Sequence, residues 1–138
     1  MKSLINIISE LSYLMGQMEE TAKEQFNLTS LTYIQMNYLE VISRLENPNI
    51  TELSVQMNLS KPTVKVAVDK LIEKDFIYKV RSDSDRRSVH LHLTEKGNLI
   101  NQMHYYAHKR IVELFNKKLD NKEIETITGL LDKVLSDN

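Results

Sequence analysis

The fold is decided by one stretch, residues 60–93, which reads SKPTVKVAVDKLIEKDFIYKVRSDSDRRSVHLHL. Apolar residues first recur every three or four positions, which predicts a helix from about Lys61 to Lys74 with one buried face. The period then becomes two, which predicts a pair of strands. The strands are expected over 77–81 and 89–93, on either side of a polar loop over 82–88. A helix that leads directly into a two-stranded hairpin is therefore expected.

Two further helices are predicted before this stretch. A short helix over about 52–57, with Thr51 as its cap, leads into Asn58, whose short side chain tolerates the left-handed conformation of a tight turn. The helix before it is expected to start at Thr32 and Gln35, which have the spacing of a capping box. Helix, short helix, tight turn, helix and hairpin, in this order, form a winged helix-turn-helix.

Long amphipathic helices are predicted on both sides of this unit. They are expected over about 4–23, 94–118 and from Asp120, which has capping-box spacing with Glu123. Their apolar faces are larger than one small winged lobe can cover, so a second copy of the chain is expected to bury them. The expected fold class is mainly α with a small two-stranded β-wing. The expected regions are a winged helix-turn-helix lobe over 31–93 and a helical dimerisation lobe over 1–30 and 94–138.

Composition excludes several classes of protein. The chain has 138 residues, with 18 basic against 19 acidic side chains, so it is not uniformly basic like a histone. It has no cysteine, which excludes disulfides and thiolate metal sites. We find no membrane span and no signal peptide, so a cytoplasmic protein is expected. Phosphate-binding loops, nucleophile elbows and paired catalytic carboxylates are also absent, so neither an enzyme nor a cofactor is expected.

Charge is unevenly distributed along the chain. The segment from Lys61 to Arg87 has a net charge of +3, whereas the remainder has −4. Lys61 and Lys65 lie four residues apart and therefore share one exposed helix face. Arg86 and Arg87 lie at the tip of the hairpin, where two guanidinium groups suit the negative potential of a narrow minor groove. This basic surface is typical of a protein that binds DNA.

At these residues the chain resembles the multiple-antibiotic-resistance regulator (MarR) family of bacterial transcription regulators. Two departures from the family pattern are Asp75, where a helix-ending glycine is usual, and Ser88, where glycine is frequent. The resemblance covers nearly the whole chain and rests on Leu31-Thr32-x-x-Gln35, Ile50-Thr51-Glu52-Leu53, Leu59-Ser60-Lys61-Pro62-Thr63-Val64, Val68-Asp69-Lys70-Leu71-Ile72-Glu73-Lys74, Asp83-x-Asp85-Arg86-Arg87 and Leu93-Thr94-Glu95-Lys96-Gly97.

The resemblance implies a homodimer that binds a pseudo-palindromic operator in double-stranded DNA. It further implies a repressor that a small molecule releases from DNA. By position, Arg87 would enter the minor groove, Arg86 would reach a phosphate and Asp85 would orient the wing. The residues expected to bind DNA are Ser60, Lys61, Thr63, Lys65, Arg81, Arg86 and Arg87, the first four of them in the major groove.

Two alternatives stay open at this point. His104 and His108 are four residues apart on one helix, a common spacing for two ligands of zinc. Zinc-responsive members of the family carry helix ligands here, but they add a Glu-His pair where this chain has Met36 and Asn37. A third ligand would have to be a glutamate of a dimer partner: Glu19, Glu20 or Glu24. The second alternative is a winged-helix module that binds a protein, for which the basic residues would be dispensable.

Overall fold

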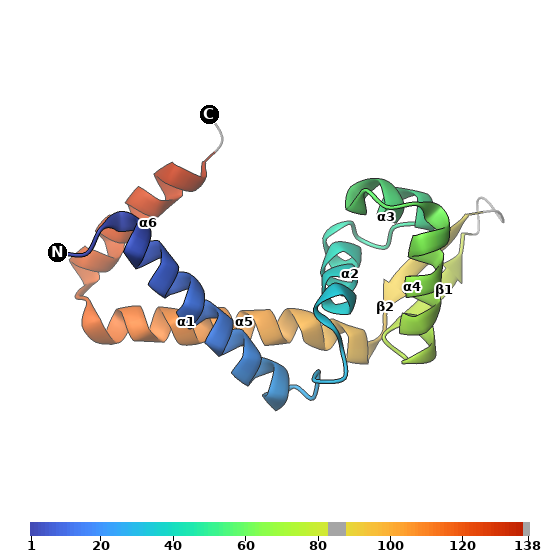
Figure 1. Ribbon diagram of the computed structural model, residues 1–138, viewed down its shortest axis with the longest axis horizontal. Helices are drawn as coiled ribbons and strands as arrows, with labels where there is room; N and C mark the ends of the chain where they lie inside the picture. The colour runs from blue at the N-terminus through green and yellow to red at the C-terminus, as the bar shows by residue number, and fades with distance from the viewer. Residues whose placement is uncertain (83–87, 137–138) are drawn as a thin grey trace. The chain divides into compact units, whose positions relative to one another are not determined.

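The computed structural model describes residues 1–82 and 88–136. Figure 1 shows its elements, which follow one another along the chain in the order α1–α4, β1, β2, α5 and α6. The elements are α1 (Leu4–Gln25), α2 (Tyr33–Arg44), α3 (Ile50–Met57), α4 (Lys61–Glu73), β1 (Ile77–Arg81), β2 (Val89–Leu93), α5 (Glu95–Lys118) and α6 (Asn121–Leu135). Both strands have the predicted bounds, and they pair antiparallel with Ile77 opposite Leu93. The predicted fold class, mainly α with a two-stranded wing, is confirmed.

The chain divides into two compact units. One comprises Met1–Ala22 and His104–Asn138, and the other comprises Lys23–Met103. The second unit contains α2, α3, α4, the sheet and the start of α5. Its interior is continuous across these elements, because each contributes at least one fully buried apolar side chain. These side chains include Leu39 and Ile42 of α2, Leu53 of α3, Val64, Val68 and Leu71 of α4, Ile77 and Leu91 of the sheet, and Ile100 of α5.

The helix starts follow from local side-chain chemistry. Thr32 and Gln35 form the predicted capping box, as do Asp120 and Glu123. The prediction that Thr51 caps α3 is wrong. Asn49 is the cap: its Oδ1 accepts from the N–H of Glu52 at 2.8 Å, and Glu52 Oε1 accepts from the N–H of Asn49 at 3.2 Å. Helix α3 therefore starts earlier than predicted, since this carboxamide offers the start of the helix a side-chain acceptor.

The link from α4 to β1 is a tight left-handed turn. Asp75 has φ of 67°, in the left-handed region that glycine adopts most readily and aspartate tolerates. The N–H of Phe76 donates to the carbonyl of Leu71, and the N–H of Asp75 donates to that of Ile72, both at 2.9 Å. These two bonds satisfy the last carbonyls of α4. The turn therefore fixes the direction in which the wing leaves α4.

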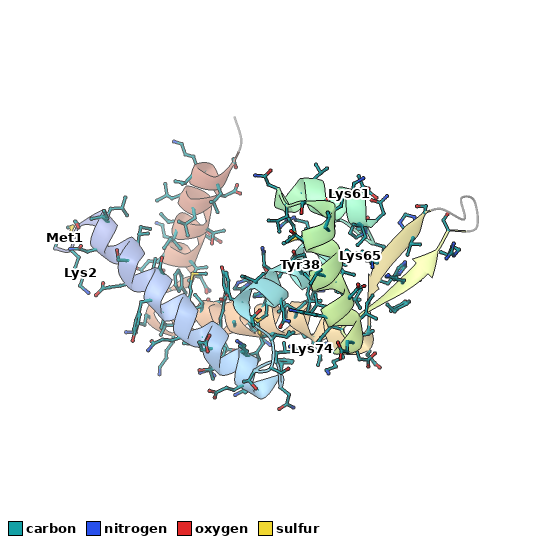
Figure 2. All side chains as sticks on the ribbon, turned by 45° about the vertical axis from the view of Figure 1, so that its right-hand side comes forward. Met1, Lys2, Tyr38, Lys61, Lys65 and Lys74 are labelled. Atoms are coloured by element: carbon teal, nitrogen blue, oxygen red, sulfur yellow. The ribbon has the colours of Figure 1, made fainter. Side chains whose placement is uncertain are left out.

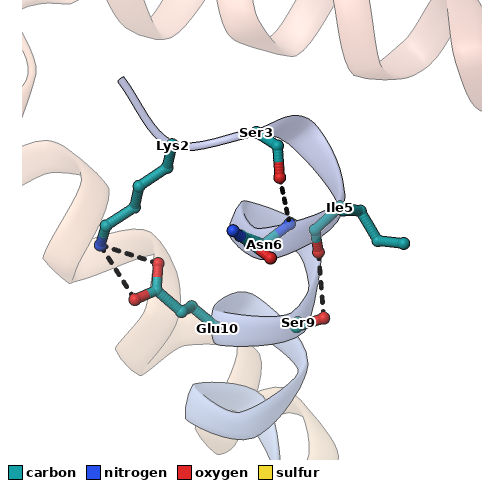
Figure 3. Close-up of polar contacts among 6 residues, drawn as sticks. All are labelled: Lys2, Ser3, Ile5, Asn6, Ser9 and Glu10. Carbon is teal, nitrogen blue, oxygen red and sulfur yellow. Dashed lines mark hydrogen bonds and ion pairs between the residues drawn. The ribbon is translucent and has the colours of Figure 1, made fainter.

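The unit made of Met1–Ala22 and His104–Asn138 has few buried side chains. Figure 3 shows the start of α1, where Lys2 Nζ contacts both carboxylate oxygens of Glu10 at 2.9 Å and Ser3 Oγ accepts from the N–H of Asn6. Large apolar side chains of both α1 and α6 are exposed, among them Leu4, Ile5, Ile8, Leu130, Val134 and Leu135. Among the described residues, no helix has the length and apolar character needed to cross a bilayer.

Candidate nucleic-acid interface

The N-terminal end of α4 is shaped by a turn and a serine cap. Asn58 adopts the left-handed conformation, with φ of 55°, and ends α3. Ser60 is the predicted cap of α4: its Oγ accepts from the N–H of Thr63 at 3.3 Å and donates to Thr63 Oγ1 at 2.8 Å. Both residues are exposed. They lie where the unpaired N–H groups and the helix dipole favour an anion such as phosphate.

Lys61 and Lys65, which the sequence predicts to bind DNA, extend from α4 near its N-terminal end (Figure 2). Both are exposed. Lys65 Nζ lies 3.1 Å from Asp69 Oδ2, and the other oxygen of that carboxylate lies 3.8 Å from Lys79 Nζ on β1. Asp69 therefore joins the helix to the wing strand through two ion pairs. Lys79 is not among the residues that the sequence predicts to bind DNA. The alternation of Lys79 and Arg81, which places both on one face of the strand, was a signal that could have found it.

The wing carries the remaining predicted contacts. Arg81 is the last residue of β1, is exposed and pairs in register with Val89. Asp85, Arg86 and Arg87 lie outside the described residues. The predicted roles of these three side chains therefore stay predictions.

Strand β2 is attached to the loop between α2 and α3. The N–H of Leu91 donates to the carbonyl of Pro48 at 2.8 Å. His90 Nδ1 lies 3.0 Å from the carbonyl oxygen of Asn47, so it donates the proton there, and Ser88 Oγ lies 3.2 Å from His90 Nε2. Both ring nitrogens of His90 therefore have protein partners.

A group of three metal-binding side chains lies in the unit that contains α1 and α6. Glu19 of α1 joins His104 and His108 of α5, and their ligand atoms lie within 4.8 Å of one another. His104 Nδ1 is 3.7 Å from Glu19 Oε1. The carboxylate comes from the same chain as the histidines, not from a partner as the sequence analysis required. One carboxylate oxygen and two imidazole nitrogens suit zinc with a water as fourth ligand.

The tyrosines of the chain differ in their burial. Tyr38 is buried in the unit 23–103, and its burial raises the pKa of the hydroxyl above the usual value for tyrosine. Tyr13 and Tyr33 are largely exposed. Tyr38 is therefore part of the core.

Comparison with known proteins shows which proteins this chain is similar to. The model of the MarR family matches residues 31–89, the segment that contains α2, α3, α4 and β1 and ends at the first residue of β2. This segment is therefore similar to the MarR family. The HTH-type transcriptional regulator PchR of Bacillus subtilis is 28% identical over 121 residues, which cover 86% of this chain and 69% of PchR.

Solved structures of MarR-type regulators have the same fold. FabT of Streptococcus pneumoniae, in complex with DNA, is 28% identical, with a TM-score of 0.64 and coverage of 96% of this chain and 94% of FabT. A mutant of Staphylococcus aureus MepR bound to an oligodeoxyribonucleotide is 19% identical, with a TM-score of 0.71 and coverage of 98% and 97%. The likeness to MepR shows the fold alone. The relative PchR is named a transcriptional regulator, and the FabT structure is a complex with DNA.

Proposed function

We propose that this chain is a transcription regulator of the MarR family and acts as a homodimer on a pseudo-palindromic operator in double-stranded DNA in the cytoplasm. Helix α4 enters the major groove, where Ser60, Lys61, Thr63 and Lys65 contact base edges and phosphates. The wing contacts the flanking minor groove through Arg81, Arg86 and Arg87, and Asp85 orients the wing. The observation that carries this proposal is the exposed lysine pair at the open, serine-capped N-terminal end of α4, the end with which recognition helices meet DNA.

A second copy of the chain is the partner that suits the unit containing α1 and α6. Val134 and Leu135 are 78% and 80% exposed, and Leu4 and Ile5 are both 74% exposed. Aliphatic side chains this exposed over two helices are unusual on a monomer and typical of an interface. A two-fold dimer also supplies two recognition helices, which contact successive major grooves about 34 Å apart.

We propose that the dimer is a repressor and that a small molecule releases it from DNA. Such a molecule can change DNA affinity only by binding one spacing of the two winged lobes better than another. Release follows when the favoured spacing no longer matches the helical repeat of the operator.

The test is a salt titration of binding to DNA upstream of the gene and to a scrambled duplex of equal length. We expect affinity at least about a hundredfold higher for the upstream DNA, with steep salt dependence. Light scattering on the same sample should give twice the mass of one chain. Weak and equal binding to both duplexes, with Lys61→Ala and Lys65→Ala unchanged, would support the protein-binding module instead.

A metal-responsive regulator is the second candidate, and the approach of Glu19 to the two histidines favours it. We propose that Glu19, His104 and His108 hold zinc and thereby fix α1 against α5. The three ligand atoms must close together from separations of up to 4.8 Å, which requires a change of side-chain rotamer.

Isothermal titration with zinc, followed by DNA binding with and without the metal, tests this candidate. His104→Ala should abolish zinc binding and any effect of zinc on DNA affinity. His92→Ala is the matched control, because the His92 ring packs at a tilt against Tyr78 in the sheet, with ring centroids 5.3 Å apart, and the substitution should leave zinc binding unchanged. Zinc affinity that is unaffected by His104→Ala would exclude the site.

A further inference from the structure

Helix α4 presents an aliphatic side chain on the face opposite its core. Val64 and Val68 have no exposed surface, whereas Val66 between them is 57% exposed. Residues two apart on a helix lie about 200° around the axis from each other, so Val66 points away from the interior. It lies one helical turn after Pro62 at the lysine-rich end of the helix.

The neighbours of Val66 are polar. On its exposed surface α4 presents Thr63, Lys65 and Asp69, and the last two are paired at 3.1 Å. Val66 is the one large apolar side chain of α4, a helix described throughout, that is mainly exposed. It has no donor for a phosphate oxygen and no acceptor for a base amine. If Val66 contacts DNA together with these polar side chains, its contact must therefore be with an apolar group of the DNA.

The major groove offers one such feature, the C5-methyl group of thymine. We propose that Val66 contacts this methyl group and so selects thymine at one position of each half-site. The inference rests on the proposed function, since it requires α4 to enter the major groove. Burying one methyl group against valine is worth about fourfold in affinity, and about fifteenfold when both half-sites of a palindrome contribute.

The test removes the methyl group and nothing else. A duplex preferred by the wild-type protein is selected from a random pool, and deoxyuridine then replaces thymidine at one symmetric pair of positions at a time. Fluorescence anisotropy at fixed salt gives the ratio of the two affinities. We expect one pair at which wild type binds deoxyuridine about fifteenfold more weakly, and we expect Val66→Ala to bring this ratio near one. Val55→Ala on α3, where the valine is also exposed, is the matched control and should keep the wild-type ratio.

The possible results separate this inference from the function on which it rests. Specific binding with a ratio below twofold at every thymine overturns the role of Val66 and leaves the operator-binding function intact. The same conclusion follows if Val66→Ala keeps the wild-type ratio. A protein that prefers no duplex over scrambled DNA overturns both.

Discussion

The carboxylate of Asp69 on α4 lies 3.8 Å from the ammonium group of Lys79 on β1. The same carboxylate holds Lys65 at 3.1 Å, so one acidic residue positions two lysines that belong to different elements. All three side chains are about half exposed or more, and ion pairs of this kind contribute little to stability. The electrostatic consequence is larger, because Asp69 offsets positive charge on the proposed DNA-binding face.

Asp69→Asn should therefore strengthen binding to DNA of any sequence. With the carboxylate removed, Lys65 and Lys79 are available to phosphates, and the plot of log K against log salt should steepen by about one for each protomer. Affinity for a scrambled duplex should rise several-fold, which reduces specificity. Glu73→Gln removes an acidic charge near the other end of α4 and is the control. An unchanged salt slope in Asp69→Asn would contradict a role of these lysines at phosphate.

Arg87→Ala should weaken operator binding and reduce the preference for A·T pairs beside the half-sites. This prediction rests on the place of Arg87 in the Asp-Arg-Arg segment, since an arginine in a narrow minor groove gains from its negative potential. Lys70→Ala, in the last turn of α4, should have little effect. Affinities for operators with A·T-rich or G·C-rich flanks check both variants. Equal losses in both would remove the assignment of Arg87 to the groove.

Glu19→Gln should weaken zinc binding by at least about tenfold, because an amide oxygen lacks the charge of a carboxylate. Glu20→Gln changes the neighbouring exposed residue in the same way and should retain the wild-type affinity. Isothermal titration of the full-length protein measures both. If Glu20→Gln has the larger effect, α1 approaches α5 through a different face.

Sequence reasoning succeeded where the information is local. The capping box of Thr32 and Gln35 and the shared face of His104 and His108 both depend on spacings of three or four residues. It failed where the partner lies on another element. Nothing in the sequence spacing brings Glu19 to His104 or gives His90 a bond to the α2–α3 loop. Those contacts depend on how elements pack, which a period of apolar residues leaves open.

The misassigned cap of α3 has a different cause. In the sequence, Asn-Pro-Asn over residues 47–49 is a strong stop signal for the helix that precedes it. In the structure Asn49 also starts the next helix, so a stop and a cap share one residue. Residues that cap helices are of the same types as those that occur in turns. At Asn49, the spacing of three residues to Glu52 indicates a cap, because it allows a capping box.

Asp75→Gly should stabilise the protein by about 1 kcal/mol. Asp75 has φ of 67°. This conformation raises the free energy of any residue that has a Cβ, whereas glycine adopts it at little cost. Its carbonyl bond from Thr94 Oγ1 involves the backbone and is retained. Urea unfolding at one protein concentration measures the change in free energy. Glu73→Gly, two residues earlier at the last residue of α4, should instead destabilise the protein, because glycine costs free energy in a helical conformation. The same sign for both substitutions would contradict the left-handed turn.

Gly97→Ala should destabilise the protein by about 3 kcal/mol and lower its Tm by about 10 °C. A Cβ on Gly97 would overlap the carbonyl oxygen of Phe76, which accepts the N–H of Thr94 at 3.1 Å, and would touch Leu93 at an ordinary contact distance. Backbone atoms cannot move aside as a flexible side chain can, so α5 must shift away from β1 or the bond to Thr94 must break. Gly16→Ala is the control, because nothing lies within 4 Å of a Cβ there and alanine favours the helix. Thermal unfolding followed by circular dichroism should show a loss for Gly97→Ala and none for Gly16→Ala, and equal Tm values would mean that the start of α5 does not pack against the Phe76 carbonyl.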